Sequence, residues 1–165
     1  MLIVLKNIKI YHSMSEETYC FEASLYADNK KITRVSNSGR GADNDYDDWD
    51  KVEPINDWCK SNLPKWKVEY SDDKFDTTID MVISDLLDRH NILKDYKKAI
   101  RKGVVRIPKN LKGQSYTIKA FPPAGSKAFL YLNKLAEKYP NEYVLNILPK
   151  EQAEKLWIEF CTNEI

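Results

Sequence analysis

The sequence predicts an α+β fold in which an N-terminal antiparallel β-meander packs with helices. Alternating apolar residues fill most of residues 1–37, whereas later segments place apolar residues at the helical spacing i, i+3, i+4 and i+7. Strands and helices also occupy partly separate stretches of the chain, which favours α+β over a doubly wound sheet. After the meander we expect a helical middle, a hairpin and a C-terminal helix–strand–helix.

The first strand is expected within residues 1–11, where apolar and polar side chains alternate. Lys6 interrupts this alternation. The residues that share the apolar face are Leu2, Val4, Ile8 and Ile10.

Two further strands, 19–27 and 30–37, are joined by the dipeptide Asp28-Asn29. Both turn residues tolerate positive φ, as a two-residue hairpin turn requires. With this turn, Leu25 is expected opposite Ile32 on one face of the hairpin.

A helix is expected to contain Trp49, Val52, Ile55, Trp58 and Cys59, because these residues recur at helical spacing. Proline is tolerated in a first helical turn, so Pro54 is expected there. A short strand is expected to follow, within residues 66–70.

The next helix has the clearest amphipathic pattern in the chain, over residues 79–87. Asp76 or Thr77 is expected to cap it. A second, short helix is expected over 93–100, and Gly103 is expected to end it.

The last third of the chain predicts a hairpin followed by a helix, a strand and a helix. Serine is a favoured helix cap, and proline suits a first helical turn. The expected elements are strands at 104–107 and 116–120, a helix capped by Ser126, a strand at 143–148 and a helix begun by Pro149.

The length of 165 residues and mass of 19.3 kDa indicate one domain, 1–165, in which a subdomain break would fall near 121–125. The net charge of +1 argues against a generic electrostatic nucleic-acid binder. The three cysteines are far apart and form no CxxC pair, which predicts reduced thiols in a cytoplasm rather than a zinc site. No stretch is long and apolar enough to predict a membrane span.

The segment from Ser36 to Tyr46, here called the glycine–arginine segment, concentrates unusual chemistry at the end of a strand. Glycines flank Arg40, so consecutive backbone N–H groups and a guanidinium could form a cradle for an anion. A strand-ending turn with a paired arginine is the alternative. The candidate ligand- or partner-binding residues are Asn37, Ser38, Gly39, Arg40, Gly41, Asp43, Asp45 and Tyr46.

The acidic residues 43–50 do not form a calcium loop. Aligned on an EF-hand, Asp48 falls where glycine is required, and Pro54 falls where the bidentate glutamate is required. We find no G-x-S-x-G elbow and no P-loop. The sequence therefore assigns no catalytic residue, metal ligand or cofactor.

A basic stretch is the best candidate for a nucleic-acid contact. The cations fall on one side of a predicted helix, where they could meet phosphates, or could form an ordinary solvated face. They are Lys94, Lys97, Lys98, Arg101 and Lys102.

Three short runs resemble a family of small proteins carried by bacteriophages, prophages and related mobile elements. The runs are 17–23 (ETYCFEA), 28–31 (DNKK) and 36–42 (SNSGRGA), and they lie within the first fifty residues. This chain has Asn29 where the family has a turn glycine, and Ala42 where it has its last glycine. The resemblance implies a phage accessory protein and carries over no catalytic residue.

The leading hypothesis is a non-enzymatic binder and inhibitor of a host component, such as an antiviral defence system, acting in the host cytoplasm. A host protein is thus the expected partner. One alternative is a protein that binds or sequesters a nucleotide or phosphorylated signal at residues 36–41. The other is a nucleic-acid-binding protein that uses the basic stretch.

Overall fold

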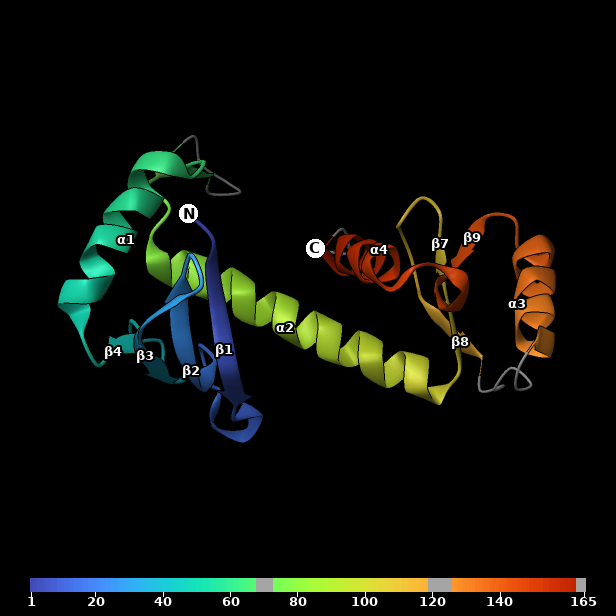
Figure 1. The fold of residues 1–165 in the computed structure, drawn as a ribbon, viewed down its shortest axis with the longest axis horizontal. Helices are drawn as coiled ribbons and strands as arrows, with labels where there is room; N and C mark the ends of the chain where they lie inside the picture. The colour runs from blue at the N-terminus through green and yellow to red at the C-terminus, as the bar shows by residue number, and fades with distance from the viewer. Residues whose placement is uncertain (68–72, 119–125, 163–165) are drawn as a thin grey trace. The chain divides into compact units, whose positions relative to one another are not determined.

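The computed structural model describes residues 1–67, 73–118 and 126–162, and it confirms the α+β class (Figure 1). Antiparallel sheets and helices form two compact units, Met1–Leu87 and Asp88–Ile165. The elements are β1 (Ile3–Ile10), η1 (His12–Met14), β2 (Cys20–Ala27), β3 (Lys30–Ser38), β4 (Asp45–Tyr46), α1 (Trp49–Asn62), β5 (Trp66–Lys67), β6 (Lys74–Phe75), α2 (Ile79–Lys102), β7 (Val104–Pro108), β8 (Tyr116–Ile118), α3 (Ser126–Lys138), β9 (Glu142–Val144), η2 (Leu145–Ile147) and α4 (Lys150–Thr162).

The boundary between the units falls inside α2, between Leu87 and Asp88. The sequence placed any subdomain break near 121–125, and these residues lie outside the described part of the chain. That the chain forms a single domain stays a prediction.

The first unit contains the expected meander, a sheet with strand order β1-β2-β3-β4 in which all neighbours are antiparallel. Asp28 and Asn29 have φ values of 46° and 65°, which confirms the two-residue turn. The expected register beyond the turn is wrong. An irregularity between Leu25 and Tyr26 places Leu25 opposite Thr33, not Ile32.

A bulge in β1 explains why Lys6 breaks the apolar alternation. Asn7 has a φ of 55°, and the pairing with β2 shifts register between Lys6 and Lys9. The strand therefore changes faces at this point, because an extra residue reverses the side-chain alternation. The residues of β1 that pack on the core are Ile3, Leu5, Ile8 and Ile10, so the expectation for Leu2 and Val4 is wrong.

One face of the meander packs against α1 and α2 around a first core. The buried residues of this core are Phe21, Ala23, Leu25, Ala27 and Val35 from the sheet, Val52, Ile55 and Cys59 from α1, and Ile79, Ile83 and Leu87 from α2. The buried Asn56 of α1 joins the two helices, since its Oδ1 accepts a hydrogen bond from the Ile79 N–H at 3.0 Å. This satisfies an otherwise unpaired donor at the start of α2.

Two expectations for helix ends are corrected. Asp48 precedes the first residue of α1, so Pro54 lies in the second helical turn and not the first. Thr78, rather than Asp76 or Thr77, contacts the N-terminal turn of α2, through its Oγ1 and the Met81 N–H at 3.4 Å.

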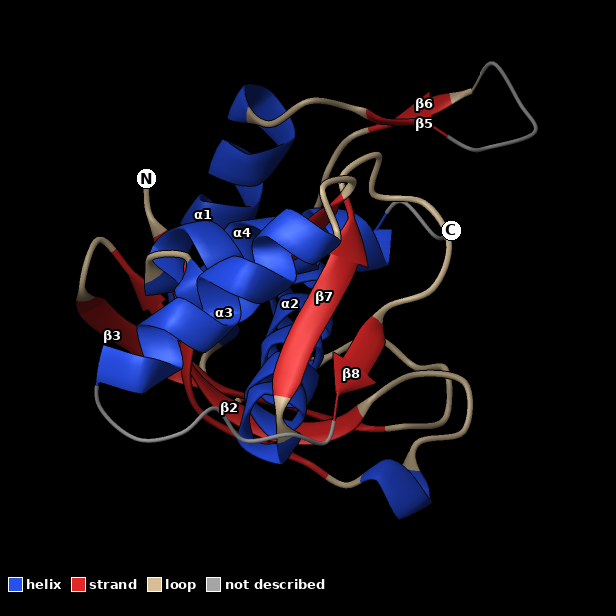
Figure 2. Ribbon diagram, turned by 90° about the vertical axis from the view of Figure 1, so that its right-hand side faces the viewer, coloured by secondary structure: helices blue, strands red, loops and turns tan. Residues whose placement is uncertain are grey.

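A two-stranded ribbon, β5–β6, projects from the rest of the first unit and forms a separate sheet (Figure 2). Its paired residues Trp66 and Phe75 are 57% and 54% exposed. Below this pair, Lys65 Nζ and Asp76 form an ion pair at 2.9 Å. The expected strand at 66–70 is confirmed for residues 66–67, and the remainder lies outside the described residues.

Residues 79–102 form one continuous helix, α2, and not two short helices. No glycine or proline lies between the two predicted segments, so adding each residue to the helix gains a hydrogen bond without a steric penalty. Gly103, with a φ of 156°, follows the last helical residue as expected.

The second unit is built around the sheet β8-β7-β9, in which β7 pairs antiparallel with both neighbours. Arg106 of β7 is buried, and its charge is compensated by Glu142 at 2.6 Å and by the Tyr139 ring, 3.6 Å from the guanidinium carbon. The expected strand at 143–148 is shorter, since the chain turns into η2 after Val144.

Candidate functional site

The glycine–arginine segment begins as the end of β3 and then folds back against the chain preceding β2. Gly39 and Gly41 have φ values of 86° and 79°, a region that favours glycine. The Gly39 carbonyl accepts hydrogen bonds from the N–H groups of Glu16, Glu17 and Thr18, at 2.9, 3.1 and 3.4 Å. The segment is therefore fixed to a second part of the backbone rather than extended into solvent.

Asn37 is the residue around which this segment is organised. Its side chain is buried, and Oδ1 accepts hydrogen bonds from the Thr18 hydroxyl at 3.0 Å and the Gly39 N–H at 2.8 Å. Its Nδ2 donates to the Ala42 carbonyl at 2.8 Å and to Asn44 Oδ1 at 3.1 Å. Because one buried amide makes four hydrogen bonds, the segment has little freedom to rearrange.

A second set of hydrogen bonds connects the segment to the first turn of α2. Asp80 Oδ1 accepts from Asn44 Nδ2 at 2.7 Å and from the Tyr46 hydroxyl at 2.8 Å. A carboxylate is also favoured near a helix N-terminus. The polar network thus runs from Thr18 through Asn37 and Asn44 to Asp80.

Burial, and then the hydrogen bond and charge of Asp80, raise the pKa of the Tyr46 phenol above its usual value. A phenol whose pKa is higher in the folded state stabilises the fold below its unfolded pKa of about 10. This contribution is lost as the pH rises above about 10, because the unfolded chain then releases the proton more readily.

We therefore expect the free energy of unfolding to fall more steeply above about pH 10 in the wild-type protein than in Tyr46→Phe. At neutral pH the substitution should cost about 1 kcal/mol through the lost hydrogen bond. Urea unfolding at neutral pH and at several alkaline pH values measures both effects. If the free energy of unfolding falls equally with pH in the two proteins, the pKa of Tyr46 is not raised in the folded state.

The structure brings together only part of the predicted set. Of the eight residues, Asn37, Gly41 and Asp43 line a cleft of about 260 Å³ beside α2. Ser38, Arg40 and Asp45 are exposed and do not line this cleft, and Gly39 is buried and does not line it either. Tyr46 does not line the cleft, but its hydroxyl donates a hydrogen bond to Asp80, which does.

Asp80 and Thr18 belong to the site but were not predicted. An aspartate in a first helical turn is common for helix stability alone, so Asp80 carried no distinct signal. Thr18 lies in the run ETYCFEA that marks the family resemblance. Only the folded register reveals that its hydroxyl contacts both Asn37 and the Gly41 N–H, the latter at 3.3 Å.

The lining of the cleft combines apolar side chains with two carboxylates. Phe21, Ile83 and Leu87 contribute the apolar lining, whereas Asp43 and Asp80 contribute carboxylates. Phosphate would be repelled by these two groups, and Arg40 does not line the cleft to offset them. Its chemistry therefore suits a ligand that donates hydrogen bonds better than a nucleotide phosphate.

Arg40 is exposed, and it makes no hydrogen bond or ion pair with any residue in the described part of the chain. The backbone of the segment therefore forms the strand-ending turn that was the alternative to an anion cradle. The ion pair expected between Arg40 and nearby acidic residues is not found among the described residues. Its backbone is held on both sides by Gly39 and Gly41, while its guanidinium is presented to solvent.

The basic stretch lies on the C-terminal half of α2, in the second unit. Lys94, Lys97, Lys98, Arg101 and Lys102 are all exposed, as expected. Across residues 1–67, 73–118 and 126–162, no three histidine, cysteine or acidic side chains gather as metal ligands. No helix within these ranges has the length and apolar character needed to cross a bilayer.

No protein-family model, curated protein or solved structure matches this chain. The resemblance to phage-borne proteins therefore stays a prediction. The site is defined by its geometry alone: a rigid polar network, an adjacent acidic cleft and an exposed arginine.

Proposed function

We propose that this protein is a non-enzymatic binding protein that contacts a protein partner through the glycine–arginine segment, with Arg40 at the centre of the contact. One observation carries the proposal. The segment is held by the four hydrogen bonds of Asn37, while Arg40 is exposed and makes no polar contact with a described residue.

A rigid segment of this kind suits recognition for a thermodynamic reason. Ordering a loop on binding costs free energy, and a loop that is already ordered avoids most of this cost. Arginine is also enriched among the residues that dominate binding energy at protein interfaces. The expected counterpart is a partner carboxylate, which can accept two hydrogen bonds from the guanidinium.

The exposed pair Trp66 and Phe75 on the β5–β6 ribbon supports the same class of function. Large aromatic residues are enriched at protein interfaces, where they bury much area at little entropic cost. Nearby Lys67 and Lys74 are also exposed, whereas the base of the ribbon contains the Lys65–Asp76 ion pair. We treat this ribbon as a second contact surface of the first unit.

The biological setting follows from the resemblance to phage-borne proteins. A small accessory factor with a rigid contact segment suits the inhibition of a host component, such as a defence protein, in the host cytoplasm. The alternative of a bound nucleotide or phosphorylated signal has less support, because Asp43 and Asp80 make the cleft acidic.

Arg40→Ala is expected to remove partner binding while leaving the fold unchanged. Loss of a central arginine should weaken binding by about 2 kcal/mol or more, roughly 30-fold, whereas a solvent-exposed substitution changes stability by about 0.5 kcal/mol or less. The measurement is quantitative mass spectrometry of bacterial lysate proteins captured on the wild-type and variant proteins, followed by titration of the purified partner.

Arg34→Ala is the matched control, since it removes the same charge from β3. Arg34 is also exposed but is paired with Glu22 at 3.0 Å. A partner that binds the wild-type protein and Arg34→Ala, but not Arg40→Ala, supports the proposal. Equal capture by all three proteins would place the contact elsewhere.

A further inference from the structure

The near-neutral charge of the chain conceals two units of opposite charge. Residues 88–165 contain 15 Lys and Arg against 8 Asp and Glu, a formal net charge of +7. Residues 1–87 contain 11 against 17, a net charge of −6. The second unit is therefore basic enough to attract a nucleic acid although the whole chain is nearly neutral, because association depends on the charge of the binding surface.

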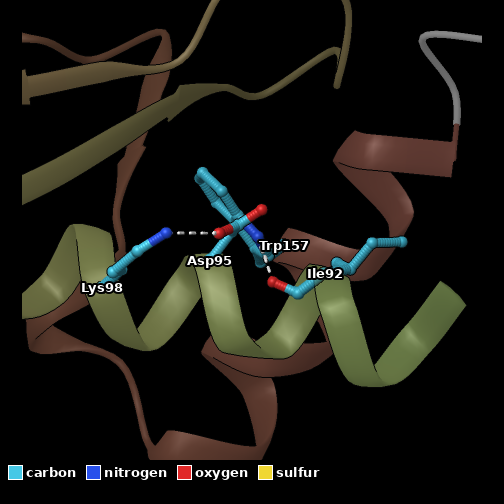
Figure 3. A network of polar contacts seen from close by, with 4 residues as sticks. All are labelled: Ile92, Asp95, Lys98 and Trp157. Atoms are coloured by element: carbon cyan, nitrogen blue, oxygen red, sulfur yellow. Dashed lines mark hydrogen bonds and ion pairs between the residues drawn. The ribbon is translucent and has the colours of Figure 1, made fainter. Parts of the chain in front are cut away.

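The C-terminal half of α2 is fixed in the second unit by a buried face. Ile92, Tyr96, Ala99 and Ile100 pack on the core that contains Trp157. The Trp157 Nε1–H also donates a hydrogen bond to the Ile92 carbonyl at 3.1 Å, as Figure 3 shows. Because this face is buried, the intervening residues of the helix are directed outward.

Those intervening residues form a basic groove of about 380 Å³. Among the described residues, its lining is His90, Leu93, Lys94, Lys97, Lys98 and Arg101. The cations follow the spacing i, i+3, i+4 and i+7, so they form one stripe along the helix. From Lys94 to Arg101 the stripe extends about 10 Å, the axial length of about three base pairs.

Little negative charge offsets this stripe. No carboxylate is among the described residues that line the groove. Asp95 pairs with Lys98 at 3.5 Å, and both side chains are highly exposed (Figure 3). Burial, followed by the charges of Lys94 and Lys97, lowers the pKa of His90, consistent with a positive potential in the groove.

Stabilisation of the helix alone does not explain the stripe. Cations complement the helix dipole within the last turn, which accounts for Arg101 and Lys102 but not for Lys94 and Lys97. An acidic protein partner is also less suitable, since lysine is depleted at protein interfaces and no aromatic side chain is among the groove's described lining.

We propose that the groove formed by Lys94, Lys97, Lys98 and Arg101 binds the phosphate backbone of a double-stranded nucleic acid, independently of its sequence. This activity belongs to the second unit and is separate from the contact proposed for Arg40. DNA and RNA duplexes share the phosphate chemistry, and the experiment distinguishes between them.

The test uses the full chain and fluorescence anisotropy of a labelled DNA duplex and an RNA duplex, titrated over a range of salt concentrations. Three phosphate contacts should make the affinity fall about 40-fold between about 50 and about 200 mM salt. The triple variant Lys94→Gln, Lys97→Gln and Arg101→Gln should lose this part of the salt dependence, reducing the slope of log K against log salt by about 3.

Two controls separate the groove from general charge and from misfolding. The triple variant Lys112→Gln, Lys134→Gln and Lys155→Gln removes the same charge from exposed sites elsewhere in the second unit and should retain most of the slope. The charge-conserving triple variant Lys94→Arg, Lys97→Arg and Arg101→Lys should bind like the wild-type protein.

Binding of either duplex, lost only in the groove variant, supports the proposal, and preference for one duplex identifies the source of the phosphates. Absence of salt-dependent binding by the wild-type protein overturns it. So does an equal loss in both glutamine variants, or binding of polyglutamate as tight as that of the duplexes.

Discussion

Gly39→Ala is expected to destabilise the first unit by about 2 to 5 kcal/mol. A non-glycine residue at a φ of 86° costs roughly 1 to 2 kcal/mol. The added methyl would also lie 2.5 Å from the Met14 carbonyl oxygen and 2.9 Å from the Cys20 Cβ. The first atom is backbone of η1 and the second is the Cβ of a buried β2 residue, so neither can rotate away, and their displacement adds an overpacking cost of about 1 to 3 kcal/mol.

Gly41→Ala provides the comparison within the same segment. Gly41 has a similar φ of 79°, but the added methyl would meet only the side chain of Glu17, which can rotate away. This variant should therefore lose only about 1 to 2 kcal/mol. Hydrogen exchange of the β2 and β3 amides measures both losses locally. An equal loss in the two variants would show that backbone conformation, and not packing against Met14, decides the cost.

Trp157→Ala is expected to have the largest effect in the second unit, a loss of about 3 to 5 kcal/mol. The Trp157 side chain is 7% exposed and lies between the rings of Tyr96 and Phe160, with ring centroids at 5.8 and 5.9 Å. Truncation leaves a cavity and removes the donor to the Ile92 carbonyl. Chemical denaturation followed by far-UV circular dichroism is the direct measurement.

Trp66→Ala is the control, because Trp66 is 57% exposed. It removes the same side chain from a surface where little area is buried, so the loss should be about 0.5 kcal/mol or less. A similar loss for both variants would mean that Trp157 does not anchor the core of the second unit. A retained fold also makes Trp66→Ala suitable for testing the β5–β6 ribbon as a partner contact.

The sequence predicted local structure well where one residue or one period decides it. Asp28 and Asn29 specify their turn because few other residues adopt positive φ. The apolar period predicted helical structure over 79–87 and 93–100, but it did not predict that both segments belong to the single helix α2. The bulge at Asn7 and the register of Leu25 could not be predicted, because they depend on pairing with another strand.

The two glycines were enough to locate the candidate site in the sequence, but they did not predict the hydrogen-bond network that holds it. From the sequence, Asn37 was only one of eight binding candidates, whereas in the structure its buried side chain organises the segment through four hydrogen bonds. Asp80 is 43 positions away from Asn37 and joins the network only through Asn44. The basic stripe was predicted by residue spacing, but the opposite charges of the two units became apparent only from the position of their boundary.

One helix contributes to two hydrophobic cores: the first half of α2 provides Ile79, Ile83 and Leu87, and the second half provides Tyr96. Cutting the chain between Leu87 and Asp88 would keep these side chains with their own cores, but it would turn the middle of the helix into two new ends, and helix ends fray. Overlapping fragments that each keep the whole of α2, spanning 1–102 and 79–165, avoid a new helix end beside either core.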